Sequence, residues 1–252
     1  FNATTSIKGK IEFKNVTFAY PLTGDKKILD NINLVINPGE TIGILGETGC
    51  GKTSLINLIP RFYDVTEGSV LVDDIDVREY NLKNLRERIS VALQKSEIFQ
   101  STIKENIRWG RENAADTDIA NAASIAQAME FISTSTDGFD TLVTQQGTSL
   151  SGGQKQRIAI SRTILKQSEI IIFDDATSAL DLKTEANLYS MLKNAYPDTT
   201  KIIIAQRIAS VKDADRIIIL DDGHISAVGT HDELLKNSAI YQDIYNSQLN
   251  KK

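Results

Sequence analysis

The chain has 252 residues, of which 41% are hydrophobic and 24% are charged, a composition typical of a globular protein. A chain of this length buries about 70–75% of its unfolded surface, so its core needs no disulfide or metal to be stable. The net charge of -5 argues against a general nucleic-acid-binding protein, which needs an excess of Lys and Arg to neutralise phosphates.

The first residues, 1–9, are polar and are predicted to form a linker. No basic segment followed by an apolar stretch marks a signal peptide. No apolar run approaches the roughly 20 residues that a membrane-spanning helix needs. Because the chain starts at Phe1, we expect it to be part of a longer protein.

Short strands are predicted in the first part of the chain. Residues 11–18 alternate apolar and polar side chains, as a half-buried strand does. Residues 32–36 form a second strand that a turn at 37–40 closes. Residues 41–45 are apolar and mostly branched, which indicates a buried strand. A strand at 69–72, a short helix at 82–88 and a strand at 89–93 follow.

A glycine-rich loop separates the strand at 41–45 from a helix that starts near residue 54. It fits the phosphate-binding pattern G-x-x-x-x-G-K-[ST] with Gly46, Glu47, Thr48, Gly49, Cys50, Gly51, Lys52 and Thr53. The glycines let backbone N–H groups point inward at phosphate oxygens, and the helix N-terminus adds a partial positive charge. We expect Lys52 to reach the β- and γ-phosphates and the Thr53 hydroxyl to bind magnesium. The alternative, a chance glycine-rich turn, is disfavoured by the strand before and the helix after.

Cys50 is the only cysteine, which excludes an internal disulfide and is typical of a reducing compartment. Its position favours a small residue in a tight turn over a redox role. The two histidines, His224 and His231, lie away from every motif, which favours surface or hairpin roles over catalysis.

Residues 96–166 are rich in alanine and polar helix formers and are predicted to be a helical insertion, with a loop at 144–150. Ser151 is expected to cap a helix that runs to Leu165. The residues that open this helix, Ser151, Gly152, Gly153 and Gln154, form a second anion cradle. One chain rarely needs two cradles for one nucleotide, so this one suggests a phosphate supplied by another subunit. A plain helix cap is the alternative.

The last part of the chain alternates strands and helices again. Residues 170–173 are a buried strand running into Asp174, whose carboxylate can hold magnesium through water. A helix at 184–194 and a strand at 201–205 follow, and Gln206 ends that strand. Residues 216–220 and 224–228 form a hairpin across an Asp-Gly turn. The tail at 232–249 is predicted to be helical.

Together these motifs resemble the nucleotide-binding domain of ATP-binding cassette (ABC) proteins, and the similarity covers essentially the whole chain. Residues 150–154 match the signature motif of that family, Tyr20 the aromatic residue that stacks on adenine, and Gln94 the glutamine loop. Residues 178–181 match the loop that crosses its dimer interface. Residues 98–107 look like the exporter branch, in which the domain follows six membrane helices.

The resemblance implies an α/β fold: a P-loop NTPase core with a mostly parallel sheet, a small antiparallel subdomain and an inserted helical subdomain. The whole of 1–252 would be one domain, with 7–95 and 167–252 as the core and 96–166 as the helical part. ATP and Mg²⁺ are the implied cofactors. The implied nucleotide-binding residues are Tyr20, residues 46–53, Ser54 and residues 151–154, and the implied metal ligands are Thr53, Gln94 and Asp174.

The implied partners are a second nucleotide-binding domain, paired head to tail across two ATPs, and the transmembrane domains of the exporter. No nucleic acid is expected. The location would be the cytoplasmic face of the cell membrane. Trp109 lies in the region expected to face the transmembrane domains, although it could equally pack within the helical segment.

Three positions depart from the family pattern. Asp175 stands where a catalytic glutamate is usual, Gln206 where a histidine is usual, and Gln145 where exporters commonly carry a glutamate. Asp is shorter than Glu by about 1.5 Å, and a shift of about 1 Å can cost roughly 10²-fold in rate. Gln206 cannot carry the charge of a histidine.

The catalytic residues are therefore expected to be Asp175, Gln206 and Gln94, in a site that binds ATP but hydrolyses it weakly. This pattern looks like the degenerate half of a heterodimeric exporter. The alternatives are that Asp175 acts as a slower base, or that the chain is a regulatory dimerisation module without turnover. A soluble ABC ATPase of DNA repair or translation is disfavoured, because the chain has neither a long coiled-coil insertion nor tandem cassettes.

Overall fold

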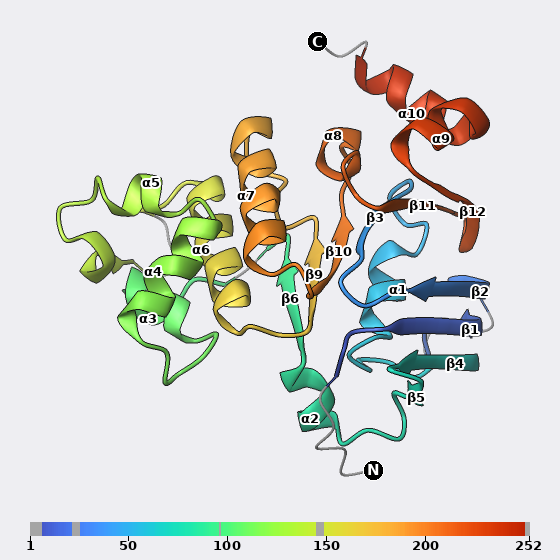
Figure 1. Cartoon of the computed structure of the whole chain (residues 1–252), viewed down its shortest axis with the longest axis horizontal. Coiled ribbons are helices and arrows are strands. Elements are labelled where there is room, and N and C mark those ends of the chain that lie inside the picture. Colours follow the sequence, from blue (N-terminus) through green and yellow to red (C-terminus); the bar gives the residue numbers. More distant parts are fainter. Residues whose placement is uncertain (1–6, 22–25, 96, 145–148, 250–252) are drawn as a thin grey trace. The chain divides into compact units, whose positions relative to one another are not determined.

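The structure is a computed structural model that describes residues 7–21, 26–95, 97–144 and 149–249. The chain divides into two compact units. Figure 1 labels the helices and strands of the chain. The first unit combines Phe1–Ile89 with Asp198–Lys252, and the second is Ser90–Pro197. The predicted Gln145 lies outside the described residues.

The first unit contains the predicted small antiparallel sheet, in the strand order β2-β1-β4-β5. Its strands are β1 (Ile11–Phe18), β2 (Leu29–Ile36), β4 (Glu67–Val72) and β5 (Ile75–Asp76). The alternation predicted for residues 11–18 is interrupted in β1, where Lys14 and Asn15 are both exposed and the register with β2 shifts between Phe13 and Val16. Buried and exposed side chains do alternate along much of β2. Strand β2 begins earlier than the predicted residue 32, because Leu29 still pairs with Phe18 across a bulge.

The same unit contains a second group of strands in the order β12-β11-β3-β10. They are β3 (Thr41–Leu45), β10 (Thr200–Ile204), β11 (Arg216–Asp221) and β12 (His224–Gly229). Strand β3 is parallel to both β10 and β11, and β11 and β12 form the predicted hairpin. Every residue of β3 and β10 is buried, which agrees with their mostly apolar sequences, and the one charged residue among them, Lys201 of β10, is buried as well.

The helices of the first unit are short. They are α1 (Lys52–Asn57), α2 (Leu82–Glu87), α8 (Ile208–Val211), α9 (His231–Asn237) and α10 (Ala239–Leu249). Helix α8 was not predicted, because four residues are too few to show a helical period.

The predicted single helical tail is wrong in one respect, since it breaks into α9 and α10 at Ser238. This residue has extended backbone angles, φ -117° and ψ 111°, and its hydroxyl accepts a hydrogen bond from the Tyr241 amide at 3.2 Å. A side chain that caps a new helix therefore interrupts the old one. Tyr241 is completely buried and its hydroxyl lies 2.5 Å from Nδ1 of His231, so that histidine has a packing role.

The second unit is mainly helical between residues 97 and 166. Its helices are α3 (Ile103–Arg108), α4 (Asp116–Ile125), α5 (Met129–Ile132), the 3₁₀ turn η1 (Gly138–Asp140), α6 (Gly152–Leu165) and α7 (Leu182–Ala195). Helix α6 packs against α3 and α4 and buries Ile158, Ile160 and Ile164. A small ladder joins β7 (Ser101–Thr102) to β8 (Leu142–Val143), and these strands are too short to be predicted.

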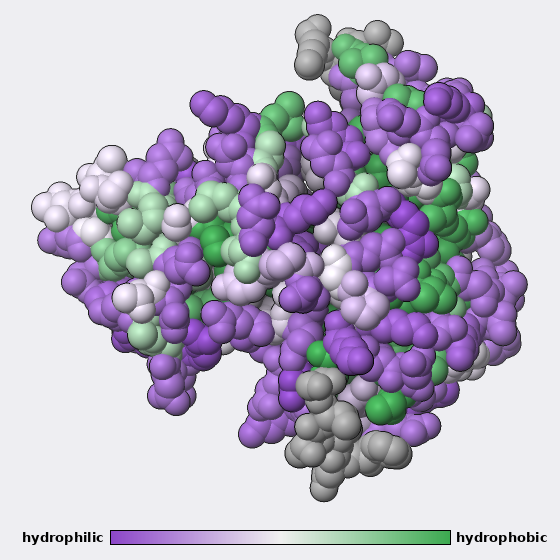
Figure 2. All heavy atoms as spheres, in the orientation of Figure 1, coloured by the Kyte–Doolittle hydropathy of each residue, from purple (hydrophilic) through white to green (hydrophobic). Residues whose placement is uncertain are grey.

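Two longer strands of this part, β6 (Ile89–Leu93) and β9 (Ile170–Asp174), are neighbours and follow their predicted ranges. The face drawn in Figure 2 is mostly hydrophilic, with apolar side chains in small patches. Within the described ranges, every helix is too short or too polar to cross a lipid bilayer.

Candidate functional site

The phosphate loop connects β3 to α1 in the first unit, as predicted. Lys52 is buried, and its ammonium group donates hydrogen bonds to the carbonyls of Gly46 at 2.6 Å and Glu47 at 2.8 Å. It also lies 3.8 Å from Sγ of Cys50. The loop therefore curls around the ammonium of its own lysine, which places a positive charge inside the ring of backbone groups.

Gly46 is required by a close approach of two backbones. A Cβ atom at this position would lie 2.2 Å from the Leu220 carbonyl oxygen and 2.6 Å from Sγ of Cys50. Leu220 belongs to β11, so this strand packs directly against the start of the loop. Any side chain at residue 46 would push the loop off the strand.

The turn between β11 and β12 is hydrogen-bonded to the backbone of the phosphate loop. The Gly223 N–H donates to the Cys50 carbonyl at 3.1 Å, and the Gly223 carbonyl accepts from the Asp30 N–H at 3.0 Å. Gly223 has φ +78°, and a Cβ there would lie 2.5 Å from the Ile28 carbonyl oxygen. The Asp-Gly dipeptide predicts this turn, but no local pattern shows that it supports the phosphate loop.

Tyr20 lies beside the first turn of α1. Its hydroxyl is 2.8 Å from the hydroxyl of Ser54, and its ring packs edge-on against Phe18 at 4.8 Å and Tyr63 at 5.1 Å between centroids. The structure thus brings the predicted base-stacking residue to the phosphate loop. An aromatic ring in this place can stack on a base whose phosphates the loop holds.

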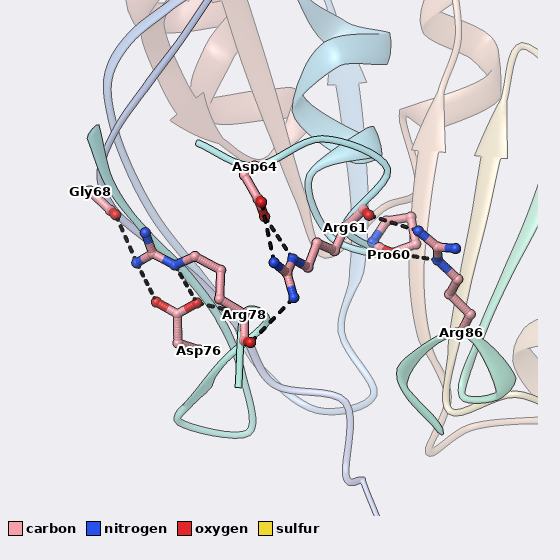
Figure 3. Close-up of polar contacts among 7 residues, drawn as sticks. All are labelled: Pro60, Arg61, Asp64, Gly68, Asp76, Arg78 and Arg86. Carbon is pink, nitrogen blue, oxygen red and sulfur yellow. Dashed lines mark hydrogen bonds and ion pairs between the residues drawn. The ribbon is translucent and has the colours of Figure 1, made fainter. Parts of the chain in front are cut away.

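Figure 3 shows the arginine contacts that fix the chain just after α1. Arg61 donates to both carboxylate oxygens of Asp64, at 2.6 and 3.2 Å, and to the carbonyl of Arg78 at 3.2 Å. Arg78 in turn pairs with Asp76 and donates to the Gly68 carbonyl. The hydrogen bond from Arg61 holds the pKa of Asp64 below its usual value, so this carboxylate stays charged.

Arg86, on α2, also fixes the chain that follows α1 (Figure 3). It donates to the carbonyls of Pro60 at 3.1 Å and Arg61 at 2.8 Å. Its guanidinium also lies over the Phe62 ring, 5.2 Å from the centroid. Charge-assisted bonds to carbonyls near the end of a helix satisfy acceptors that the helix cannot pair itself. The far end of α1 is therefore anchored as firmly as its start at the loop.

Gln206 is exposed and lies two residues after the end of β10 at Ile204, one residue earlier than the predicted end of this strand, and β10 pairs in parallel with β3. Parallel strands end at the same edge of a sheet, and here Ile204 lies opposite Ile44. Gln206 and the phosphate loop are therefore at one edge of the first unit, as the motif order predicts.

The second unit holds the other predicted site residues. Asp174 is buried at the end of β9, and Asp175 follows it with a left-handed backbone, φ +51°. Asp tolerates this conformation better than most residues because its short side chain bonds locally. The Asp175 carbonyl accepts from the Ser178 N–H at 3.3 Å, which starts the turn that leads into α7.

Gln156, on α6, joins two predicted loops of this unit. It is buried, and its Nε2 donates to the Gln94 carbonyl at 3.2 Å and to the Ser178 hydroxyl at 3.0 Å. Its Oε1 accepts from the Ala179 N–H at 2.9 Å. The sequence analysis did not identify Gln156. It could have been found as a polar residue on the face of α6 that the helical pattern predicts to be buried.

The signature segment begins α6 with a reciprocal cap. The Ser151 hydroxyl accepts from the Gln154 N–H at 3.2 Å, and Oε1 of Gln154 accepts from the Ser151 N–H at 2.9 Å. Ser151 and Gly152 are exposed. The predicted helix start is thus confirmed, and the segment presents a helix N-terminus to its surroundings.

Mg²⁺ prefers oxygen donors, and the predicted ligands Thr53, in the first unit, and Asp174, in the second, each carry a side-chain oxygen. Among residues 7–21, 26–95, 97–144 and 149–249, no three His, Cys, Asp or Glu side chains gather as an all-protein metal cage would require. Mg²⁺ keeps water and phosphate oxygens and needs only one or two protein oxygens. The exposed Thr53 and the buried carboxylate of Asp174 are oxygen donors of this kind.

The chain is similar to several known proteins. A family model described as ABC transporter matches residues 29–178. The chain is 41% identical to an ATP-dependent lipid A-core flippase of Hahella chejuensis, over 97% of the chain and 42% of the flippase. It is 40% identical to ABC transporter B family member 4 of Dictyostelium discoideum, over 97% of the chain and 32% of that protein.

A solved structure is also similar, that of a bacterial Atm1-family ABC exporter with ATP bound. The TM-score is 0.93 at 35% identity, over 98% of this chain and 43% of the exporter chain. The chain therefore spans less than half the length of each of these relatives.

The first prediction concerns Gly223→Ala. The added methyl group meets the Ile28 carbonyl and needs a left-handed backbone, so the turn must move and release the Cys50 carbonyl. We expect the free energy of unfolding to fall by about 1–3 kcal/mol and the affinity for ATP to weaken about tenfold. Urea unfolding and titration calorimetry measure the two effects.

Gly138→Ala is the matched control, because Gly138 also has a positive φ, +52°, but its nearest neighbour is the Ile132 oxygen at 4.0 Å. It should lose stability without losing ATP affinity. Equal ATP affinities in the two variants would show that the turn does not support the loop.

The second prediction concerns Gln156→Leu. The groups that Gln156 binds lie near the surface and can turn to water, so we expect a loss in unfolding free energy of only about 1–2 kcal/mol. The Ala179 amide should nevertheless exchange hydrogen faster, because its acceptor is gone. The exposed Gln100→Leu is the control, with an expected change within about 0.5 kcal/mol. Unchanged exchange at Ala179 would contradict the linking role.

Proposed function

The chain belongs to the ABC transporter family, and we propose that it is one of two ATP-hydrolysing domains that pair on ATP and drive an exporter. It is an ABC-type ATPase domain, homologous to the ATP-binding parts of exporters. The observation that carries the proposal is the buried ammonium of Lys52, held inside a glycine loop between a parallel strand and a helix.

In the proposed site, Tyr20 stacks on adenine, and the loop amides with the Lys52 ammonium bind the β- and γ-phosphates. The nucleotide-binding set is Tyr20, Gly46, Glu47, Thr48, Gly49, Cys50, Gly51, Lys52, Thr53 and Ser54. Thr53, Gln94 and Asp174 would hold Mg²⁺, which when bound neutralises charge on the transferring phosphate. The contact between Tyr20 and Ser54 supports this proposal, because it fixes the ring beside the loop.

Hydrolysis at this chain's own loop is proposed to be weak. Asp175 would accept the proton of the attacking water but reaches less far than a glutamate. Gln206 would donate a hydrogen bond to the γ-phosphate without adding charge. The exposed position of Gln206 at the same sheet edge as the loop supports its role.

A second, non-identical domain is the proposed partner, and the cradle of Ser151, Gly152, Gly153 and Gln154 would complete its site. The exposed N-terminus of α6 supports this role, because it offers N–H groups to an anion outside the chain. The hydroxyl of Ser151 already caps its own helix, so backbone groups would make most of the contact.

The transmembrane part of the exporter is the second proposed partner, on the surface around α3. Trp109 is 68% exposed and stacks on Phe99 with 4.4 Å between ring centroids. A hollow of about 420 Å³ beside it is lined by Glu105, Arg108, Trp109 and Glu112. An exposed aromatic residue next to a hollow is typical of a docking site. The chain would then lie at the cytoplasmic face of the membrane.

A regulatory dimerisation module is the alternative function. In that case the chain binds ATP and closes on its partner, which performs all hydrolysis. Single-turnover hydrolysis at this chain's own loop, with the partner's loop disabled, separates the two proposals, since a regulatory module leaves the bound ATP intact.

The third prediction is a repair of hydrolysis. Asp175→Glu together with Gln206→His should raise turnover at this loop by up to about 10²-fold, because the base regains its reach. The left-handed backbone at residue 175 is less favourable for Glu, which offsets part of the gain. Asp175→Glu alone should give a smaller rise. Turnover no higher than in the unaltered transporter would contradict the proposal.

The fourth prediction compares damage in two places. Gly153→Asp puts a carboxylate where the partner's phosphate would lie, and its Cβ would also meet the Ala179 carbonyl at 3.0 Å. We expect it to abolish ATPase activity of the assembled transporter while this chain still binds ATP. Lys52→Ala should abolish ATP binding by this chain but leave partial activity from the partner's loop.

Steady-state ATPase rates and titration calorimetry measure these effects side by side. A mild Gly153→Asp variant together with an inactive Lys52→Ala variant would show that the active loop belongs to this chain.

A further inference from the structure

Gln248, on the terminal helix α10, closes over the segment that carries Gln206. Its Oε1 accepts from the Ile208 N–H at 2.9 Å, and its Nε2 donates to the Gln206 carbonyl at 2.7 Å. One amide group therefore binds both ends of the segment 206–208. All four groups belong to the first unit.

The bond to Ile208 replaces a cap that the segment cannot supply itself. Helix α8 begins at Ile208, and the first N–H groups of a helix have no partner within it. Arg207 occupies the cap position and lacks the short oxygen-bearing side chain that caps a helix from there. Gln248 provides the acceptor from 40 residues further along the chain.

The start of α10 is fixed, so Gln248 has a defined place. Tyr241 is completely buried, and Gln242 donates from its side chain to the Leu235 carbonyl of α9 at 2.6 Å. Burial raises the pKa of Tyr241 to about 12, so its hydroxyl stays protonated and bound to His231 at physiological pH. The helix is thus anchored at one end and reaches the 206–208 segment with the other.

We propose that Gln248 is a positioning residue for Gln206, and that the terminal helix thereby controls hydrolysis at this chain's phosphate loop. The proposal rests on the proposed function, which places Gln206 at the γ-phosphate. Gln248 binds only backbone groups of the segment, so it would position a histidine at residue 206 in the same way. The helix provides a route by which a contact on the C-terminal end of the chain changes the rate.

The test uses the full-length transporter that carries this chain, with Gln248→Ala and the matched control Gln242→Ala. Both glutamines are on α10 and both donate to a backbone carbonyl, but Gln242 binds α9 and not the segment. In Gln248→Ala, we expect the Ile208 amide to exchange hydrogen about 5- to 30-fold faster, as for the loss of one or two hydrogen bonds. Single-turnover hydrolysis at this loop should slow by a similar factor, while ATP affinity stays within about twofold, because Lys52 and Tyr20 are unchanged.

Gln248→Glu adds a graded readout, since a carboxylate still accepts from Ile208 but cannot donate to the Gln206 carbonyl. It should keep the protection of Ile208 and give an intermediate rate. A simple loss of stability would instead affect Gln242→Ala and Gln248→Ala equally, and that result would overturn the proposal.

Two other results would also overturn it. Unchanged hydrogen exchange at the Ile208 amide in Gln248→Ala would show that the hydrogen bonds of Gln248 to the 206–208 segment are absent in solution. Faster exchange with an unchanged hydrolysis rate would show that the segment does not control the reaction. Failure of the proposed function gives a different result. In that case Lys52→Ala would bind ATP normally, independently of the results for the Gln248 variants.

Discussion

The buried ammonium group of Lys52 is the constraint on which the first unit depends. A buried charge without partners costs several kcal/mol, so the ammonium group needs hydrogen-bond acceptors beside it. The Gly46 and Glu47 carbonyls meet this need only because the loop curls back on itself. That curl brings Gly46 against β11 and leaves the Cys50 carbonyl for Gly223. The β11–β12 hairpin, far along the sequence, therefore supports the conformation of the phosphate loop.

The two units use the same device, one polar side chain that binds backbone groups from several segments. In the first unit Gln248 closes over residues 206–208, and in the second Gln156 binds Gln94 and the 178–179 turn. An amide suits this task because it donates and accepts at once and stays neutral. Each site loop thus depends on a helix at a distance in sequence, which allows events on that helix to change the loop.

Local patterns predicted the strands and the site motifs because the signal lies in neighbouring residues. Strands such as β3, β9 and β10 are rich in branched apolar residues, and the glycine loop is a contiguous motif. Helix α8 and the β7–β8 ladder were missed because they are too short to show a period. The break at Ser238 and the contacts of Gly223, Gln156 and Gln248 were missed because their partners are distant in sequence, and only the folded chain brings them together.

Trp109 gives the chain a reporter that needs no label. It is the single tryptophan, it is largely exposed, and its indole stacks on Phe99, whose ring also lies 5.4 Å from the Arg162 guanidinium. Indole emission moves to shorter wavelengths when water leaves the ring, and neighbouring cations alter its intensity. Fluorescence of the unmodified chain therefore reports on the surface around Trp109. A molecule that binds over this residue will change its emission spectrum.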